Sequence, residues 1–195
     1  FGVNVMPRMK VEKSTTSSEV RESLLLATRN LVSTHGLRGF TIDDVARDAF
    51  VSKSALYHHF SNLQELIDLA LLGWFEEMID EDLQSIADLS RMATASELRV
   101  AMANLNEHVY SENRRSVRIH RTLILASAAH GSPALSEGFR KAHQQLHQGF
   151  ADLVSTLKRR GIFRDNVDAQ SVASLMVAVT FGMAFNEAAE IATEK

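Results

Sequence analysis

The chain has 195 residues, of which 45% are hydrophobic and 23% are charged, and it contains no cysteine. This composition predicts ordered globular structure and excludes disulfide bonds, thiolate nucleophiles and thiolate metal sites. The net charge of −3 excludes a uniformly basic coat protein for nucleic acid, although it leaves room for a local basic patch. The most apolar run, 175–185, is too short to span a bilayer, so we expect a cytoplasmic protein without a membrane segment.

Three helices are predicted in the first sixty residues. Thr16 or Ser17 is a candidate N-cap for the first helix, which is expected to end at Gly36. Thr41 and Ser52 are candidate N-caps of two short helices, each with apolar residues at helical spacing. A turn of three or four residues joins these two helices, which is the geometry of a helix-turn-helix.

The remainder of the chain is also predicted to be helical. The expected helices cover 62–88, 95–112, 115–129, 133–160 and 167–192. No segment alternates polar and apolar residues as a strand does, so the sequence predicts an all-α fold. The N-terminal three-helix unit would therefore be followed by a larger helical domain.

The third predicted helix separates its residue types between two faces. Its outer face carries an ammonium, a hydroxyl, a phenol and an imidazole, from Lys53, Ser54, Tyr57 and His58. This face has no carboxylate of its own, so it can donate hydrogen bonds to phosphates and base edges without repelling DNA. The helix N-terminus near Ser52 adds free backbone N–H groups and a partial positive charge.

The stretch from Thr41 to Leu66, TIDDVARDAFVSKSALYHHFSNLQEL, resembles the DNA-binding domain of the tetracycline-repressor (TetR) family. The family pattern has a Thr, a short helix with an Ile/Val-Ala pair, Ala-Gly-Val-Ser, Leu-Tyr-x-His-Phe and a closing Glu-Leu. The resemblance implies an all-helical, homodimeric transcriptional regulator, usually a repressor, that a small molecule releases from DNA. The implied domains are a DNA-binding domain at 17–61, with its helix-turn-helix at about 41–60, and an effector-binding and dimerisation domain at 62–195.

The resemblance also implies which residues meet DNA. By position they are Thr41, Ser52, Lys53, Ser54, Ala55, Tyr57, His58 and His59. Thr41 and Tyr57 would hold phosphates, whereas Lys53 and Ser54 are the candidates for base readout. His59 borders the inward face, so packing is an equal alternative for it. Two such helices, one duplex turn of ~34–36 Å apart, predict a near-palindromic operator.

Two residues depart from the family pattern. Phe50 occupies the place of the turn glycine, where a left-handed backbone disfavours a bulky side chain. We expect either a reshaped turn or burial of the Phe50 ring to offset this cost. Leu63 replaces the basic residue at the start of the fourth helix, so one phosphate contact is expected to be missing. Both departures bear on operator affinity and leave the predicted fold unchanged.

The last predicted helix is apolar nearly all round, which predicts two buried faces, one toward its own core and one toward a second copy. Together with helix 133–160 it is expected to form a four-helix dimer interface. A core helix of a monomer is the alternative. The candidate interface residues are Leu146, Phe150, Leu153, Val172, Met176, Val179 and Met183.

An effector pocket is predicted among helices 62–112 and 115–150. Its candidate residues are Trp74, Phe75, Met78, Met102, Leu105, His108, Ile119, His120, Leu123 and Phe150, with ordinary core packing as the alternative for each. The lining is mostly apolar, and no Arg/Lys pair is expected to point inward. We therefore expect a small apolar or aromatic effector.

Other chemistries have little support in the sequence. His143 and His147 have metal-binding spacing, but neighbouring glutamines favour a solvated face and no further ligand completes a set. There is no phosphate-binding glycine loop, zinc-protease motif or nucleophile elbow, so neither an enzyme nor a cofactor is expected. The alternative function is a helical dimerising protein or small-molecule carrier with weak or no operator binding, which Phe50 and Leu63 favour.

Overall fold

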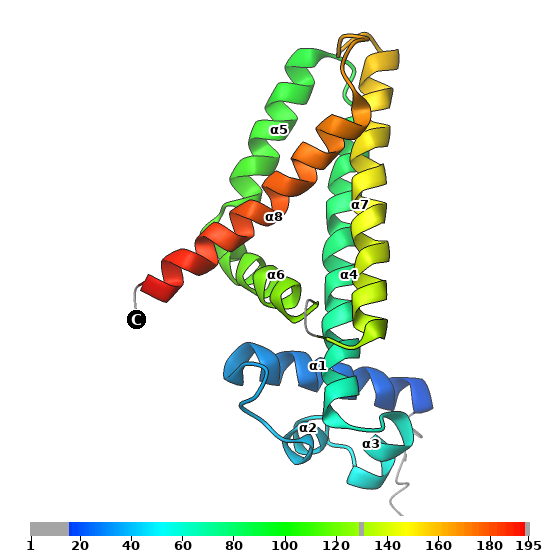
Figure 1. Ribbon diagram of the computed structural model, residues 1–195, viewed down its shortest axis with the longest axis vertical. Coiled ribbons are helices and arrows are strands. Elements are labelled where there is room, and N and C mark those ends of the chain that lie inside the picture. The colour runs from blue at the N-terminus through cyan, green and yellow to red at the C-terminus, as the bar shows by residue number, and fades with distance from the viewer. Residues whose placement is uncertain (1–15, 129–130, 194–195) are drawn as a thin grey trace, which may run out of the picture. The chain divides into compact units, whose positions relative to one another are not determined.

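The structure, a computed structural model, describes residues 16–128 and 131–193, with side chains described up to residue 182 except that of Ala128 (Figure 1). These residues form eight α-helices and one short 3-10 helix, and none of them lies in a strand. The predicted all-α fold is therefore confirmed. The chain falls into two compact units, which divide between Leu66 and Ile67.

The first unit holds the three N-terminal helices. They are α1 (Ser17–His35), α2 (Ile42–Asp48) and α3 (Lys53–His59). Thr16 caps α1: its hydroxyl accepts the Glu19 N–H at 3.2 Å, and the Glu19 carboxylate accepts the Thr16 N–H at 2.7 Å. Gly36 ends α1 with a φ of 72°, as its position after His35 predicted. The core of this unit includes Leu24, Leu31, Val32, Phe40, Val45, Leu56 and Phe60.

The second unit is built from the remaining helices. They are α4 (Leu63–Ser90, which begins in the first unit), α5 (Ala95–Val109), η1 (Glu112–Arg114), α6 (Arg115–Ala128), α7 (Pro133–Arg159) and α8 (Ala169–Thr193). The helix expected at 95–112 instead ends at Val109 and is followed by the 3-10 turn of η1. The other predicted boundaries lie within two residues of those observed.

Helices α4 and α7 run side by side in the same direction (Figure 1). Two glycines of α7 allow this close approach: the Leu72 side chain lies over Gly138, and the Leu83 side chain lies over Gly149. A Cβ atom at either glycine would lie 2.6 Å from the leucine methyl carbon. Because both pairs have the same sequence offset, the two helices keep one register over three turns.

Polar contacts fix both ends of this helix pair. At the start of α7, the buried Asp68 carboxylate accepts the Ser132 N–H at 3.0 Å. At its end, the Arg160 guanidinium donates to the carbonyl oxygens of Ser90 and Met92. These bonds satisfy backbone groups that the helix termini leave without an intrahelical partner.

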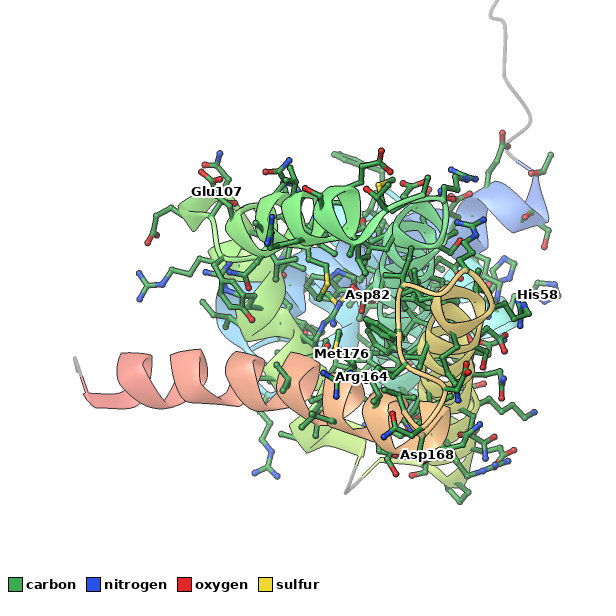
Figure 2. All side chains as sticks on the ribbon, turned by 90° about the horizontal axis from the view of Figure 1, so that it is seen from above. His58, Asp82, Glu107, Arg164, Asp168 and Met176 are labelled. Carbon is green, nitrogen blue, oxygen red and sulfur yellow. The ribbon has the colours of Figure 1, made fainter. Side chains whose placement is uncertain are left out.

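Helix α8 packs against α7 and α6 within the second unit (Figure 1). Of the α8 side chains that are described, Ala173 and Val177 are buried, with exposed fractions of 0% and 4%. Figure 2 shows Asp82 and Met176 toward the middle of this unit and Glu107 of α5 at its outside. No helix among the described residues is long and apolar enough to cross a membrane.

Candidate nucleic-acid interface

The start and end of α3 follow from its sequence. The Ser52 hydroxyl accepts the Ala55 N–H at 3.2 Å, so Ser52 is the N-cap that its position predicted. Leu56 and Phe60 are each 1% exposed and attach the inner side of the helix to the core of the first unit. Burial of that side leaves the opposite side of α3 for solvent or a partner.

The polar residues of α3 lie on the exposed side. Lys53, Ser54 and His58 are exposed, and the Tyr57 side chain retains 54% of its accessible surface. Ala55 and His59 are half-buried, which places them at the edge of this face. The predicted outward direction of Lys53 and Tyr57 is thus present in the structure. Their role toward DNA stays a prediction at this point.

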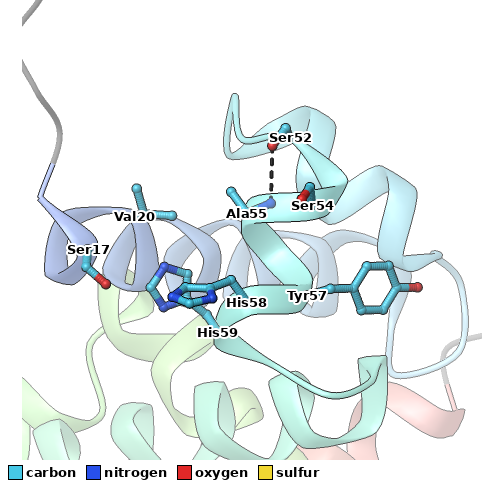
Figure 3. A pocket seen from close by; sticks show the side chains of 8 residues that line it. All are labelled: Ser17, Val20, Ser52, Ser54, Ala55, Tyr57, His58 and His59. Atoms are coloured by element: carbon cyan, nitrogen blue, oxygen red, sulfur yellow. Dashed lines mark hydrogen bonds between the residues drawn. The ribbon is translucent and has the colours of Figure 1, made fainter.

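An open hollow lies between α3 and the start of α1 (Figure 3). It is lined by Ser17, Val20, Ser52, Ser54, Ala55, Tyr57, His58 and His59. In the close view Tyr57 points away from the paired imidazoles, whose centroids are 5.5 Å apart. Ser17 and Val20 were not among the sequence candidates, because the pattern of α3 carries no information about which end of α1 lies beside it.

The N-terminus of α2 has its own capping network. Thr41 donates from both its backbone N–H and its hydroxyl to the Asp44 carboxylate, at 2.8 and 2.7 Å. The hydrogen bond from the Thr41 hydroxyl, the bond from its N–H and the neighbouring Arg47 lower the pKa of Asp44 to about 2. Thr41 remains exposed, so its position permits a contact with a phosphate.

One carboxylate reaches the face of α3 from a neighbouring helix. Asp43 of α2 lies 2.6 Å from the Lys53 ammonium, measured from Oδ2 to Nζ. The hydrogen bond to Asp43 raises the pKa of Lys53, which keeps this amine fully charged. As predicted, α3 itself contributes no carboxylate to this face. However, Asp43 of α2 neutralises the ammonium of Lys53, the first residue of α3.

The turn between α2 and α3 differs from both expected outcomes. Phe50 has a φ of 56°, so the turn keeps the left-handed conformation, and the side chain is 97% exposed. The expectation of a reshaped turn or a buried ring was wrong, because the turn retains its geometry without covering the ring. Leu63, the other departure, is half-buried at the start of α4.

The residues proposed for an effector pocket separate by burial. Phe75, Met78 and Phe150 are buried, whereas Met102 is 41% exposed and His108 is also exposed. The other five candidates are half-buried: Trp74, Leu105, Ile119, His120 and Leu123. Met102 and His108 lie on the outer face of α5, since an amphipathic helix turns only one stripe toward its neighbours.

Two aromatic rings of this set are in contact. The Trp74 and His120 rings lie 4.3 Å apart, centroid to centroid, and join α4 to α6. Burial lowers the pKa of His120 below its usual value, so the imidazole is neutral at pH 7. A neutral imidazole can act as either donor or acceptor toward a polar group on an otherwise apolar ligand.

A buried arginine adjoins the same region. Arg121 is 7% exposed, and its guanidinium donates to the Asp82 carboxylate at 2.8 Å. The expectation concerned an inward-pointing Arg/Lys pair, and Arg121 is a single buried cation that the sequence did not single out. Its sequence neighbours RIHRTLIL place one charge within an otherwise apolar stripe of α6. Asp82 neutralises this charge inside the unit, as buried charges require.

The candidate dimer residues also fall into two groups. Leu146, Phe150 and Leu153 of α7 are at most 8% exposed and belong to the core of their own chain. In α8, Val179 is 47% exposed, and Leu175, which was not a candidate, is 62% exposed. Val172 and Met176 are half-buried, and the side chain of Met183 lies outside the described residues.

The histidine pair of α7 has other partners. The His147 imidazole is hydrogen-bonded to the Ser174 hydroxyl at 3.0 Å, and the His143 ring stacks on Phe181 at 5.8 Å. Burial, and secondarily the charge of His147, lowers the pKa of His143. Among the described side chains, no three His, Asp or Glu residues gather as a metal-ligand group.

Comparison with known proteins finds a family model for the N-terminal part of the chain and relatives along most of its length. Residues 24–70 match the family model of the bacterial regulatory proteins of the tetR family. The HTH-type transcriptional regulator CymR of Pseudomonas putida is 29% identical over 167 residues, which cover 85% of this chain and 78% of CymR. The HTH-type transcriptional repressor KstR2 of Rhodococcus jostii is 31% identical over 83 residues, 39% of this chain and 41% of KstR2.

Solved structures have the same fold. A TetR-family transcriptional regulator from Mesorhizobium loti aligns with a TM-score of 0.71 at 21% identity, covering 90% of this chain and 85% of that one. NemR from E. coli, in its reduced form, aligns with a TM-score of 0.65 at 15% identity, covering 90% and 89%. At these identities the structural likeness establishes the fold alone.

Proposed function

Because the chain belongs to the TetR family and is a ligand-responsive, DNA-binding transcriptional regulator, we propose that it is a repressor that binds its operator through α3. The observation that carries this proposal is the exposed polar face of α3, from which Lys53 and Tyr57 project beside Ser54. One of its relatives is a repressor, which supports repression over activation of transcription. We assign residues 17–61 to DNA binding and residues 62–195 to effector binding and dimerisation.

The residues of the interface have separate roles in this proposal. Ser54 and Lys53 stand in the first turn of α3, the end of a recognition helix that meets base edges. Tyr57 donates to a phosphate and sets the register of the helix, and Thr41 donates to a second phosphate once its hydroxyl leaves the Asp44 carboxylate. Ser17 extends the same hydroxyl-rich surface onto α1, since it lines the hollow with Ser54 and His58. Ser52, Ala55 and His59 complete the interface.

A homodimer follows from the two faces of α8 in this proposal. Ala173 and Val177 are buried in the chain, whereas Leu175 and Val179, four residues apart, share an exposed apolar side. A second copy of α8 would cover that side, together with Val172 and Met176. This arrangement would place two copies of α3 on one duplex, so the operator would be near-palindromic. Leu175→Glu with Val179→Glu should yield monomers in analytical ultracentrifugation and abolish operator binding.

The proposed effector is a small apolar or aromatic molecule. Trp74, His120 and Leu123 are half-buried in the second unit, so a ligand can reach them without dismantling the core. The buried charge of Arg121 is already neutralised by Asp82, which removes the strongest attraction for an anionic ligand. The neutral His120 imidazole offers the polar contact that orients an apolar ligand.

A second candidate function is a dimerising protein or small-molecule carrier with weak operator binding. The pairing of Lys53 with Asp43 favours it, because the leading cation of α3 is neutralised before any DNA arrives. The exposed ring of Phe50 and the apolar Leu63 add two non-basic residues near the interface. This candidate predicts binding to the chosen operator no tighter than to random duplex.

The test of the proposed function uses the full-length protein and the DNA flanking its own gene. Gel shifts at 150 mM salt should detect one complex of two protomers on this DNA. Its affinity should exceed the affinity for random duplex by at least about a thousandfold. A panel of apolar aromatic compounds should include members that raise the thermal midpoint and release this DNA. Equal binding to operator and random DNA would contradict the repressor and support the carrier.

A further inference from the structure

Among the described residues of the first unit, Phe50 is the least protected large apolar side chain. Its side chain is 97% exposed, against 57% for Leu26 and 54% for Tyr57. It is also the one non-glycine residue with a positive φ among the residues that the structure describes. The left-handed backbone of Phe50 costs free energy on folding, and its exposed ring gains none from burial.

The hydrogen bonds at the end of α2 explain the conformation of Phe50. The Phe50 N–H donates to the Arg47 carbonyl at 3.1 Å, and the Val51 N–H donates to the Ala46 carbonyl at 2.9 Å. These two bonds define a Schellman cap, which requires a left-handed residue directly after the helix. The geometry of the turn therefore sets the φ of Phe50, and the ring has no part in producing it.

The same cap occurs at the end of α7 with a glycine. There the Gly161 N–H donates to the Lys158 carbonyl and the Ile162 N–H to the Leu157 carbonyl, both at 2.9 Å. Gly161 has a φ of 72° and takes the conformation without a side-chain penalty. The chain thus contains a matched pair of caps, and only the cap next to α3 carries an aromatic ring.

The place of Phe50 indicates what could use the ring. It lies two residues before Ser52, the N-cap of α3, and three before Lys53, at the end of the recognition helix that enters the major groove. The charged groups beside it along the chain are Arg47, which pairs with Asp44, and the exposed Asp48. The Phe50 side chain has no polar atom, so it cannot hydrogen-bond to a base edge or a phosphate and is suited to an apolar contact.

We propose that Phe50 makes an apolar contact with a thymine methyl group of the operator and so determines one base preference in each half-site. This inference rests on the proposed function of α3. The thymine C5 methyl is the one apolar group that base pairs present in the major groove. Strain retained at an exposed residue is expected where a partner uses that residue.

The test begins with duplexes selected from a random pool by the full-length protein. Binding is then measured by fluorescence polarisation for the wild type, Phe50→Gly and Phe50→Ala. Each thymine of the selected half-site is replaced in turn by deoxyuridine, which removes only the methyl. Phe50→Gly removes the ring and the strain, whereas Phe50→Ala removes the ring and keeps the left-handed residue.

Both variants should bind the selected duplex roughly 5- to 20-fold more weakly than the wild type. One deoxyuridine replacement should weaken the wild type by a similar factor and leave both variants unaffected. Phe50→Gly should also raise the thermal midpoint by roughly 1–4 °C, which rules out misfolding as the cause of its weaker binding.

Three results would overturn the inference. Variants that bind as tightly as the wild type would show that the ring does not meet DNA. Weaker binding without any deoxyuridine effect would assign the ring to the sugar backbone instead of a methyl group. A changed oligomeric state in Phe50→Gly would assign it to a protein contact. If the wild type enriches no sequence at all, the proposed function itself fails, and this outcome is distinct from the other three.

Discussion

The ammonium of Lys53, the first residue of α3, lies 2.6 Å from the carboxylate of Asp43 in α2. Both side chains are more than half exposed, so water and salt compete with this ion pair and it can open readily. For Lys53 to reach a base edge or a phosphate, it must leave Asp43. The carboxylate would then stand beside the negatively charged DNA backbone.

Replacing Asp43 by Asn should therefore strengthen DNA binding. We expect a roughly three- to tenfold gain in affinity at 50 mM salt and a smaller gain at 200 mM, because the change removes one repulsive charge and frees one cation. Glu107→Gln, the same charge change on the exposed side of α5, is the control and should leave affinity unchanged. Fluorescence polarisation titrations at the two salt concentrations measure these affinities. Weaker binding by Asp43→Asn would contradict the prediction and would mean that the ion pair holds Lys53 in its binding position.

The two Schellman caps predict opposite effects of substitution on stability. Phe50→Gly removes the strain of a left-handed backbone at a residue with a side chain, but glycine also has greater freedom in the unfolded chain. The net effect should be a stabilisation of about 0.5–1 kcal/mol. Gly161→Ala places a Cβ in open space but at a φ of 72°, so it should destabilise by about 0.5–1.5 kcal/mol. Urea unfolding of both variants measures these changes. A stabilising Gly161→Ala would contradict the geometry of the α7 cap.

Removing one member of the Arg121–Asp82 ion pair should lower the free energy of unfolding more than replacing both members by apolar residues. Asp82→Ala leaves the guanidinium buried without a counter-charge, so we expect a loss of about 2–4 kcal/mol in the free energy of unfolding. Changing both, with Arg121→Met and Asp82→Leu, should lose less than Asp82→Ala alone. Chemical denaturation of the single and double variants provides the comparison, and a double variant less stable than Asp82→Ala would argue for a net attractive pair.

Two histidines predict how stability depends on pH. Burial lowers the folded-state pKa of His120 and of His143, so the unfolded chain binds more protons than the folded one as pH falls through and below 6.5. Stability should therefore decrease from pH 7 to pH 5. The lowered carboxyl pKa values, including that of Asp44, would remove stability only at more acidic pH, so they do not obscure this window. Thermal unfolding of the double variant His120→Gln with His143→Gln should show a smaller loss of stability between pH 7 and pH 5 than the wild type. An equal loss would exclude these imidazoles as its cause.

The helix boundaries were predictable from sequence because their signals are local. Thr16, Thr41 and Ser52 cap the helices that follow them, and each hydroxyl needs only the next three residues to act. The division of α3 into an apolar side with Leu56 and a polar side with Tyr57 follows from helical periodicity in the same way.

The contacts between helices were not predictable in this way. The approach of Asp43 to Lys53 depends on the angle at which α2 meets α3, and no residue spacing encodes that angle. Arg121 breaks the apolar pattern of α6, and only the position of Asp82 on another helix explains its burial. Phe50 was recognised as a departure, but its exposure could not be read from sequence because the cap fixes the backbone alone.

The most direct measurement of the role of α3 is the ratio of affinities for the selected operator and for random duplex, at 150 mM salt. The wild-type ratio should be at least about a thousand. Lys53→Ala with Tyr57→Ala should reduce it by roughly a hundredfold or more while thermal stability is retained, since both side chains are largely exposed. A double variant that keeps the wild-type ratio would contradict the assignment of α3 as the helix that reads DNA.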